Sequence, residues 1–141
     1  MKIRVLLTFI LMPLFLFAQK KADDIIGNWI IGDNKAKIQV YKAGSKYYGK
    51  ITWLREPNKN GKPKTDIHNP DASKRTTPII GLVVLKNFVF DSGEWNSGNI
   101  YDPSSGKEYS CKINMPDKNT LKVRGYIGIS LFGRTEVWKR E

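Results

Sequence analysis

Apolar and polar side chains alternate along most of the chain beyond residue 26, in short runs separated by turn-forming residues. In one such run Ala36, Ile38 and Val40 share a face, and the residues between them are polar. This period of two is typical of β-strands that bury one face, whereas an amphipathic helix repeats its apolar positions at i, i+3, i+4 and i+7. Because the helical spacing is absent from this part of the sequence, we expect an all-β protein.

Eight strands are predicted between the turn signals. They cover about residues 27–31, 36–41, 46–54, 79–90, 94–101, 108–115, 121–127 and 133–140. Eight strands joined mostly by tight turns can close an antiparallel up-and-down barrel, which leaves no exposed sheet edge. Such a barrel either fills with side chains or leaves room for one small ligand. We therefore expect an eight-stranded barrel, with a two-sheet sandwich as the alternative.

The N-terminus predicts export. Lys2 and Arg4 precede an apolar run over residues 5–17, which ends next to Ala18. This is the pattern of a secretory signal peptide, and the run is shorter than the roughly 20 residues that span a bilayer. We predict a signal peptide over residues 1–18 and one barrel domain over residues 19–141, periplasmic or secreted, without a transmembrane segment after cleavage. A retained membrane anchor is the alternative, whereas a lipid anchor is excluded because the only cysteine is Cys111.

The chain is strongly basic, with a formal net charge of +11 at pH 7. Its lysines and arginines are spread through nearly every segment, which favours a solvated basic exterior. Attraction to an anionic envelope lipid is the alternative. Nucleic acid is not an expected partner of an exported chain that carries no recognisable nucleic-acid-binding motif.

Gly27 and Trp29 open the first predicted strand with a Gly-x-Trp triplet. The triplet resembles the signature of lipocalins, in which the indole closes one barrel end and a basic side chain of the last strand packs across it. The last predicted strand offers two structural partners for a cation–π contact with Trp29, namely Arg134 and Arg140. The sequence alone leaves the choice between them open.

Further sequence strings extend this resemblance over nearly the whole predicted domain. They are residues 49–54 (GKITWL), 97–103 (SGNIYDP), 106–109 (GKEY) and 121–128 (LKVRGYIG), with Gly61, Asp66, Asn69, Arg75, Pro78 and Gly81 between the first two. The chain is similar to a family of small exported bacterial proteins known as domain of unknown function twenty-one forty-seven. The resemblance implies a lipocalin-like, calycin-type barrel, and it implies no catalytic residue because the family has no established activity or ligand.

The long connection over about residues 55–78 has no strand pattern, and such segments often form lids or binding loops. Asp66 and Asn69 are expected to be structural there, because both side chain types cap turns. Two hypotheses describe the role of Arg75. In the first, Asp66 and Arg75 pair or hydrogen-bond the loop down over one barrel mouth; in the second, Arg75 faces the interior and binds an anionic headgroup or carboxylate.

Aromatic side chains supply the clearest functional indication, because a cavity that they line suits an apolar ligand with a polar end. The candidate ligand-binding residues are Tyr47, Trp53, Arg75, Phe88, Trp95, Tyr101 and Tyr109. We expect the barrel to bind a small amphipathic or apolar molecule, such as a fatty acid or another lipid-like compound. The alternative is an envelope interaction module with a filled barrel, which contacts anionic lipid or a protein partner.

Sequence signals for an enzyme, a metal site or a cofactor site are weak. His68, the only histidine, lies in the long connection far from Cys111, which is predicted to be a buried apolar side chain. The acidic residues near His68 match neither a zinc site nor a calcium loop. We therefore expect no catalysis, no metal and no cofactor. A weak hydrolase built on carboxylates near turns is a third hypothesis, with Asp91, Glu94, Asp102 and Glu108 as its candidates.

Overall fold

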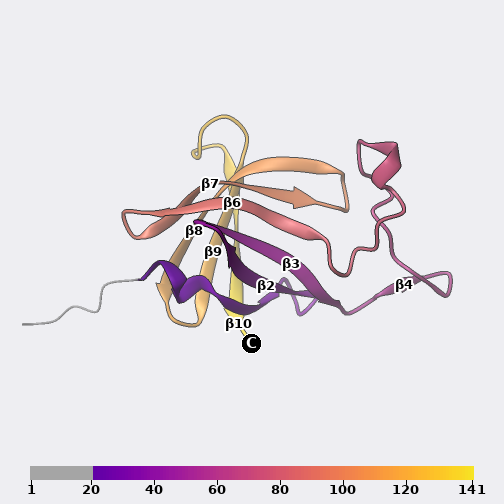
Figure 1. Cartoon of the computed structure of the whole chain (residues 1–141), viewed down its shortest axis with the longest axis horizontal. Coiled ribbons are helices and arrows are strands. Elements are labelled where there is room, and N and C mark those ends of the chain that lie inside the picture. Colours follow the sequence, from indigo (N-terminus) through magenta and orange to yellow (C-terminus); the bar gives the residue numbers. More distant parts are fainter. Residues whose placement is uncertain (1–20) are drawn as a thin grey trace, which may run out of the picture.

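Eight strands form one closed antiparallel barrel in the computed structural model, which describes residues 21–141 (Figure 1). The strands are β1 (Gly27–Ile31), β2 (Ala36–Ala43), β3 (Lys46–Leu54), β6 (Val83–Asp91), β7 (Glu94–Asp102), β8 (Lys107–Asp117), β9 (Thr120–Tyr126) and β10 (Gly133–Arg140). Each pairs with the next along the chain, and β10 returns to β1 with Trp29 opposite Arg140. The predicted up-and-down barrel is confirmed and the sandwich is excluded, while the predicted signal peptide lies outside the described residues.

Short elements accompany the barrel. The connection between β3 and β6 contains a small hairpin of β4 (Asn58–Lys59) and β5 (Lys62–Pro63), and the 3-10 turn η2 (Ala72–Lys74) follows it. Figure 1 shows the hairpin projecting beyond the barrel. A second 3-10 turn, η1 (Ala22–Ile25), precedes β1. Within residues 21–141, no helix is long and apolar enough to cross a membrane.

Several strand ends differ from the sequence prediction. β6 begins at Val83 and not near residue 79, because the backbone turns at residues 79–82: the Leu82 amide donates to the Ile79 carbonyl over 3.0 Å. Gly81 supports this turn with a φ of 95°, which side chains other than glycine rarely adopt. β8 extends to Asp117, beyond its predicted end. Ile79 remains buried although it lies in the turn.

One end of the barrel is covered by η1, and we call this end the base. The Trp29 indole N–H donates to the Ile25 carbonyl over 2.9 Å, and that of Trp95 donates to the Ala22 carbonyl over 3.0 Å. Both indoles are fully buried. The Tyr47 hydroxyl donates to the Asp23 carboxylate over 2.5 Å, and burial followed by this bond raises the pKa of Tyr47 to about 12. The aromatic rings therefore fill the interior of the base, and the polar group of each ring has a hydrogen-bond partner.

Arg140, and not Arg134, lies across Trp29. Its guanidinium carbon is 4.2 Å from the centroid of the ring. The same group donates to the carbonyls of Lys118, Asp24 and Ile26 over 2.7, 2.8 and 3.1 Å. Gly27 leaves the space for it, because a Cβ at that position would lie 2.5 Å from Arg140 Nη1. The Gly-x-Trp triplet and the last strand thus form a single structural unit.

The half of the barrel next to the base is filled by side chains. A Cβ added at Gly98 would lie 2.5 Å from the ring of Phe88, and one at Gly49 would lie 2.8 Å from Leu85 Cδ1. Phe88 and Leu85 are each 1% exposed. Glycines in these strands therefore make room for large neighbours, and little free volume remains near the base.

Candidate functional site

The other half of the barrel encloses a cavity of about 1050 Å³ that opens at the end opposite the base, which we call the mouth. Its wall is mostly apolar, formed by Ile31, Ile38, Ile51, Leu54, Val84, Ile100, Val123 and Trp138. Small-molecule sites usually measure about 300–1000 Å³ and have apolar walls with a few polar groups. The interior is thus filled near the base and open near the mouth. The barrel is therefore not entirely filled by side chains.

Gly125 is the point where the β9 wall leaves room for the cavity. A Cβ there would meet Ile100 Cγ2 at 3.4 Å and Tyr109 Cβ at 3.6 Å, which are ordinary contacts, and Gly125 itself lines the cavity. This differs from Gly98, whose missing side chain is replaced by the Phe88 ring. The space that a side chain would occupy at Gly125 is therefore part of the cavity.

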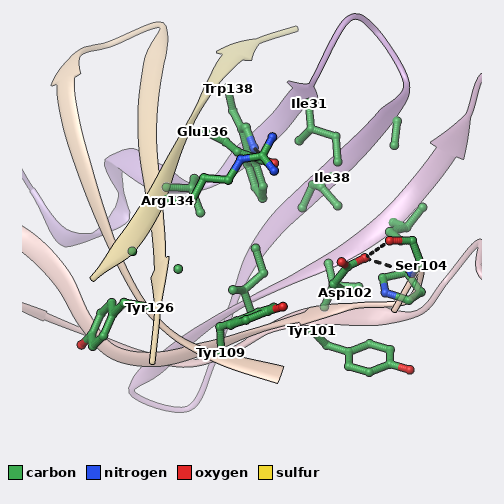
Figure 2. A pocket seen from close by; sticks show the side chains of 18 of the residues that line it. Ile31, Ile38, Tyr101, Asp102, Ser104, Tyr109, Tyr126, Arg134, Glu136 and Trp138 are labelled. Atoms are coloured by element: carbon green, nitrogen blue, oxygen red, sulfur yellow. Dashed lines mark hydrogen bonds between the residues drawn. The ribbon is translucent and has the colours of Figure 1, made fainter. Parts of the chain in front are cut away.

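Two charged side chains stand on the inner face of β10. Arg134 and Glu136 line the cavity on the same strand as buried Trp138, and alternation along a strand gives these three residues one face (Figure 2). Glu136 Oε2 accepts a hydrogen bond of 3.3 Å from the Trp138 indole. The Arg134 side chain has neither a hydrogen bond nor an ion pair with any residue between 21 and 141. A mostly apolar cavity therefore presents a cation without a side-chain partner near its mouth.

The long connection is attached to the mouth through Asp66, which is fully buried. Its carboxylate accepts hydrogen bonds of 2.8 Å from the Tyr101 hydroxyl and from Asn69 Nδ2. Burial, together with the hydrogen bond to Asp66, raises the pKa of Tyr101 to about 12. The Asp66 amide also donates to the Thr77 carbonyl over 2.8 Å. Asp66 therefore ties the middle of the connection, and through Thr77 its last residues, to β7.

Comparison with known proteins agrees with this architecture. The bacterial family described as "Uncharacterized protein conserved in bacteria (DUF2147)" matches residues 27–140, which include all eight barrel strands. The chain belongs to this family. Among solved structures, a Helicobacter pylori protein described as "Protein HP1028 from the human pathogen Helicobacter pylori belongs to the lipocalin family" superimposes with a TM-score of 0.73, at 19% identity and over 82% of each chain. No curated protein matches the chain. The fold of this DUF2147 protein is thus lipocalin-like.

In this DUF2147 protein the residues predicted to bind a ligand are not brought together. Tyr101 and Tyr109 line the cavity. Tyr47, Phe88 and Trp95 instead fill the base, because their bulk packs where η1 closes the barrel. These three side chains therefore do not line the cavity.

Trp53 and Arg75 also lie away from the cavity. Trp53 is 37% exposed on the outside of the barrel, where the Lys37 ammonium lies 5.4 Å from its ring centroid. Arg75 is exposed in the connection and donates to the Asn69 carbonyl over 2.8 Å. Asp66 and Arg75 form no ion pair with each other. Both side chains instead make hydrogen bonds within the loop, and Asp66 also binds Tyr101, as the first hypothesis allowed. Arg75 does not line the cavity, so the second hypothesis does not describe it.

Arg134 and Glu136 line the cavity, and the sequence analysis did not predict this role for either of them. Their signal was available in the alternation of β10, since an inward Trp138 places residues 136 and 134 on the inner face as well. The carboxylates considered for a hydrolase do not form one group, because Asp91 and Glu94 pair at the start of β7 whereas Asp102 and Glu108 lie at its end. Asp102 accepts hydrogen bonds from the Ser104 amide and hydroxyl over 2.9 and 2.6 Å, as in a capped turn. Within residues 21–141, no three His, Cys, Asp or Glu side chains gather as metal ligands.

Cys111 is fully buried on the inner face of β8, as its apolar neighbours predicted. Burial, assisted by the Glu136 carboxylate, raises the pKa of its thiol to about 12. Because the thiolate is the reactive species, we expect Cys111 to react with Ellman's reagent at pH 8 about a thousandfold more slowly in the folded protein than in urea. Rapid stoichiometric labelling of the folded protein would contradict this burial.

Proposed function

We propose that this protein is a non-enzymatic carrier, periplasmic or secreted, that binds one small amphipathic molecule such as a fatty acid. The observation that supports the proposal is the cavity of about 1050 Å³ with an apolar wall and one open end. Each methylene group moved from water into such a wall contributes about 0.8 kcal/mol. Burial of an aliphatic chain therefore supplies most of the affinity, and no chemical step is needed.

Arg134 gives the ligand an orientation. Its guanidinium is unpaired among the described residues and lies on the cavity face near the mouth, whereas the wall farther inside is apolar except for Glu136. A carboxylate or phosphate that meets Arg134 forms a charge-assisted hydrogen bond, and the aliphatic part then points toward the base. Glu136 restricts the bound anion to the outer part of the cavity, because its carboxylate repels a second negative charge placed deeper.

Binding of cis-parinaric acid, a fluorescent fatty acid, to the chain from residue 19 onward tests this orientation. We expect Arg134→Gln to weaken binding about tenfold, because a hydrogen bond to a charged group contributes about 1.5–3 kcal/mol. Lys122→Gln is the matched control, since Lys122 is exposed on the outer face of β9, and it leaves binding unchanged. The corresponding fatty alcohol is expected to bind the wild type and Arg134→Gln equally.

Native mass spectrometry of the protein purified from its own host identifies what the cavity holds. We expect one small molecule per chain, released when the protein unfolds. If cis-parinaric acid does not bind and no retained molecule is found, the carrier proposal fails. If the acid binds but Arg134→Gln does not weaken it, the cavity role stands and the proposed orientation is wrong.

A further inference from the structure

The loop between β9 and β10 presents a cluster of large apolar side chains to solvent. Ile127, Ile129, Leu131 and Phe132 are 72%, 58%, 75% and 72% exposed. Most other large apolar side chains of the described chain are buried in the barrel core. Four such residues within one short loop form a contiguous apolar tip, and patches of this kind mark interaction surfaces. We call residues 127–132 the apolar loop.

Arg124 holds the apolar loop in shape. Its guanidinium Nε donates to the Ser130 carbonyl over 2.7 Å and Nη2 donates to the Leu131 carbonyl over 3.2 Å, while Nη1 reaches the Thr135 hydroxyl over 2.9 Å. The Phe132 amide also donates to the Ile129 carbonyl over 3.1 Å. These bonds fix the backbone of the apolar loop in a conformation in which its apolar side chains point outward.

The apolar loop stands at the mouth of the cavity. Ile127, Leu131 and Phe132 belong to the cavity lining although most of their surface faces solvent. Figure 1 shows the loop as a projection beyond the ends of β9 and β10. The first charged residue after it is Arg134, and Lys35 also lines the same mouth. The carboxylates of Asp102 and Glu136 line the cavity as well, so the attraction to anionic headgroups comes from the basic excess of the whole chain. The exposed apolar tip matches the acyl-chain layer of such a bilayer.

We propose that the apolar loop docks the mouth onto a lipid bilayer with anionic headgroups, with Leu131 and Phe132 inserted among the acyl chains. The chain carries a net charge of +11 as a whole and of +9 without Lys2 and Arg4 of the predicted signal peptide. This charge attracts the chain to such a surface from a distance, and burial of the loop then holds it there. Docking in this orientation places the cavity entrance at the membrane. The surface extends the carrier role by giving an amphipathic ligand a path out of the bilayer, but it does not depend on which ligand the cavity holds.

Sedimentation with vesicles tests the docking. The chain from residue 19 onward, which lacks the apolar N-terminal run, is mixed with vesicles of phosphatidylcholine and phosphatidylglycerol and with vesicles of phosphatidylcholine alone. We expect binding to the anionic vesicles that weakens with added salt. Leu131→Ser combined with Phe132→Ser reduces partitioning by about tenfold for each side chain. The matched control, Ile67→Ser combined with Val137→Ser, removes two other exposed apolar side chains and leaves partitioning within about twofold of wild type.

A fluorescent label reports which part of the protein enters the lipid. Because native Cys111 is buried, a nitrobenzoxadiazole maleimide placed at Ile129→Cys labels one site, and its emission is expected to rise and shift to the blue on anionic vesicles. The same label at Ser45→Cys, in the turn between β2 and β3 at the base, is expected to show no change. An equal response at both positions, or none at Ile129→Cys, overturns the proposal.

Two further measurements separate docking from other roles of the loop. Sedimentation velocity without lipid is expected to show a monomer, and self-association that disappears in the serine double variant assigns the loop to a second copy instead. Ile129→Ser changes an exposed side chain of the loop that does not line the cavity, and it is expected to weaken vesicle partitioning while binding of cis-parinaric acid stays unchanged. If the serine double variant loses ligand binding while vesicle partitioning is unchanged, the loop is a wall of the cavity and docking is overturned. If wild type partitions as proposed but binds no ligand, the carrier role fails and docking stands.

Discussion

Replacement of Gly125 by tryptophan is expected to abolish most ligand binding while the barrel remains folded. The new side chain would project from the β9 wall into the cavity, where a Cβ meets only ordinary contacts with Ile100 and Tyr109. Its indole then occupies volume that an aliphatic ligand requires. Misplaced bulk in a binding site costs about 1–3 kcal/mol, so we expect cis-parinaric acid to bind roughly tenfold to a hundredfold more weakly.

Two variants bracket the Gly125→Trp result. Gly125→Ala adds a single methyl group at normal contact distance and is expected to bind the acid as wild type does. Gly98→Ala adds the same methyl group 2.5 Å from the Phe88 ring and is expected to lower the free energy of unfolding by about 1–3 kcal/mol in urea. Full binding by a folded Gly125→Trp protein would place the ligand site outside the cavity.

The variant Arg140→Ala is expected to produce the largest loss of stability. It removes the cation above the Trp29 ring together with the donors to three carbonyls of the base. Hydrogen bonds from charged groups and a cation–π contact are each worth about 0.5–3 kcal/mol, and the side chain is only partly buried. We expect the free energy of unfolding in urea to fall by about 2–4 kcal/mol.

Arg134→Ala is the matched control, since both arginines lie on the last strand and both changes remove one positive charge. The Arg134 side chain makes no hydrogen bond or ion pair within the described residues, so its removal is expected to change stability by less than about 0.5 kcal/mol. The two variants thus separate a structural arginine from a ligand-facing one. Equal stability loss in both would mean that the contacts around Arg140 contribute little.

The barrel could be predicted from the sequence because strand alternation and turn residues are local signals. Ala36, Ile38 and Val40 alternate with polar residues, and this alone identifies the buried face of β2. The predicted start of β6 was wrong because residues 79–82 are apolar and yet turn around Gly81. Hydrophobicity reports that Ile79 is buried, but it does not report the backbone conformation in which Ile79 is buried.

The site could be predicted only in part, because its location depends on depth along the barrel axis. Alternation tells whether a side chain points inward, but it does not tell whether an inward side chain lies near the base or near the mouth. Tyr47 and Tyr109 both belong to strands with this pattern, and only Tyr109 lines the cavity. The base is set by η1, whose contacts with Trp95 join residues 73 positions apart in the sequence. No local pattern contains that information.

The four tryptophans of the chain give the molecule a built-in optical sensor. Trp138 lines the cavity, whereas Trp29 and Trp95 lie beneath it in the sealed base and Trp53 lies on the outer surface. Emission from Trp138 should therefore respond to an occupant, while the other three indoles supply a constant background. A chain that keeps Trp138 and carries phenylalanine at position 53 can be screened against a library of unlabelled compounds by intrinsic fluorescence alone.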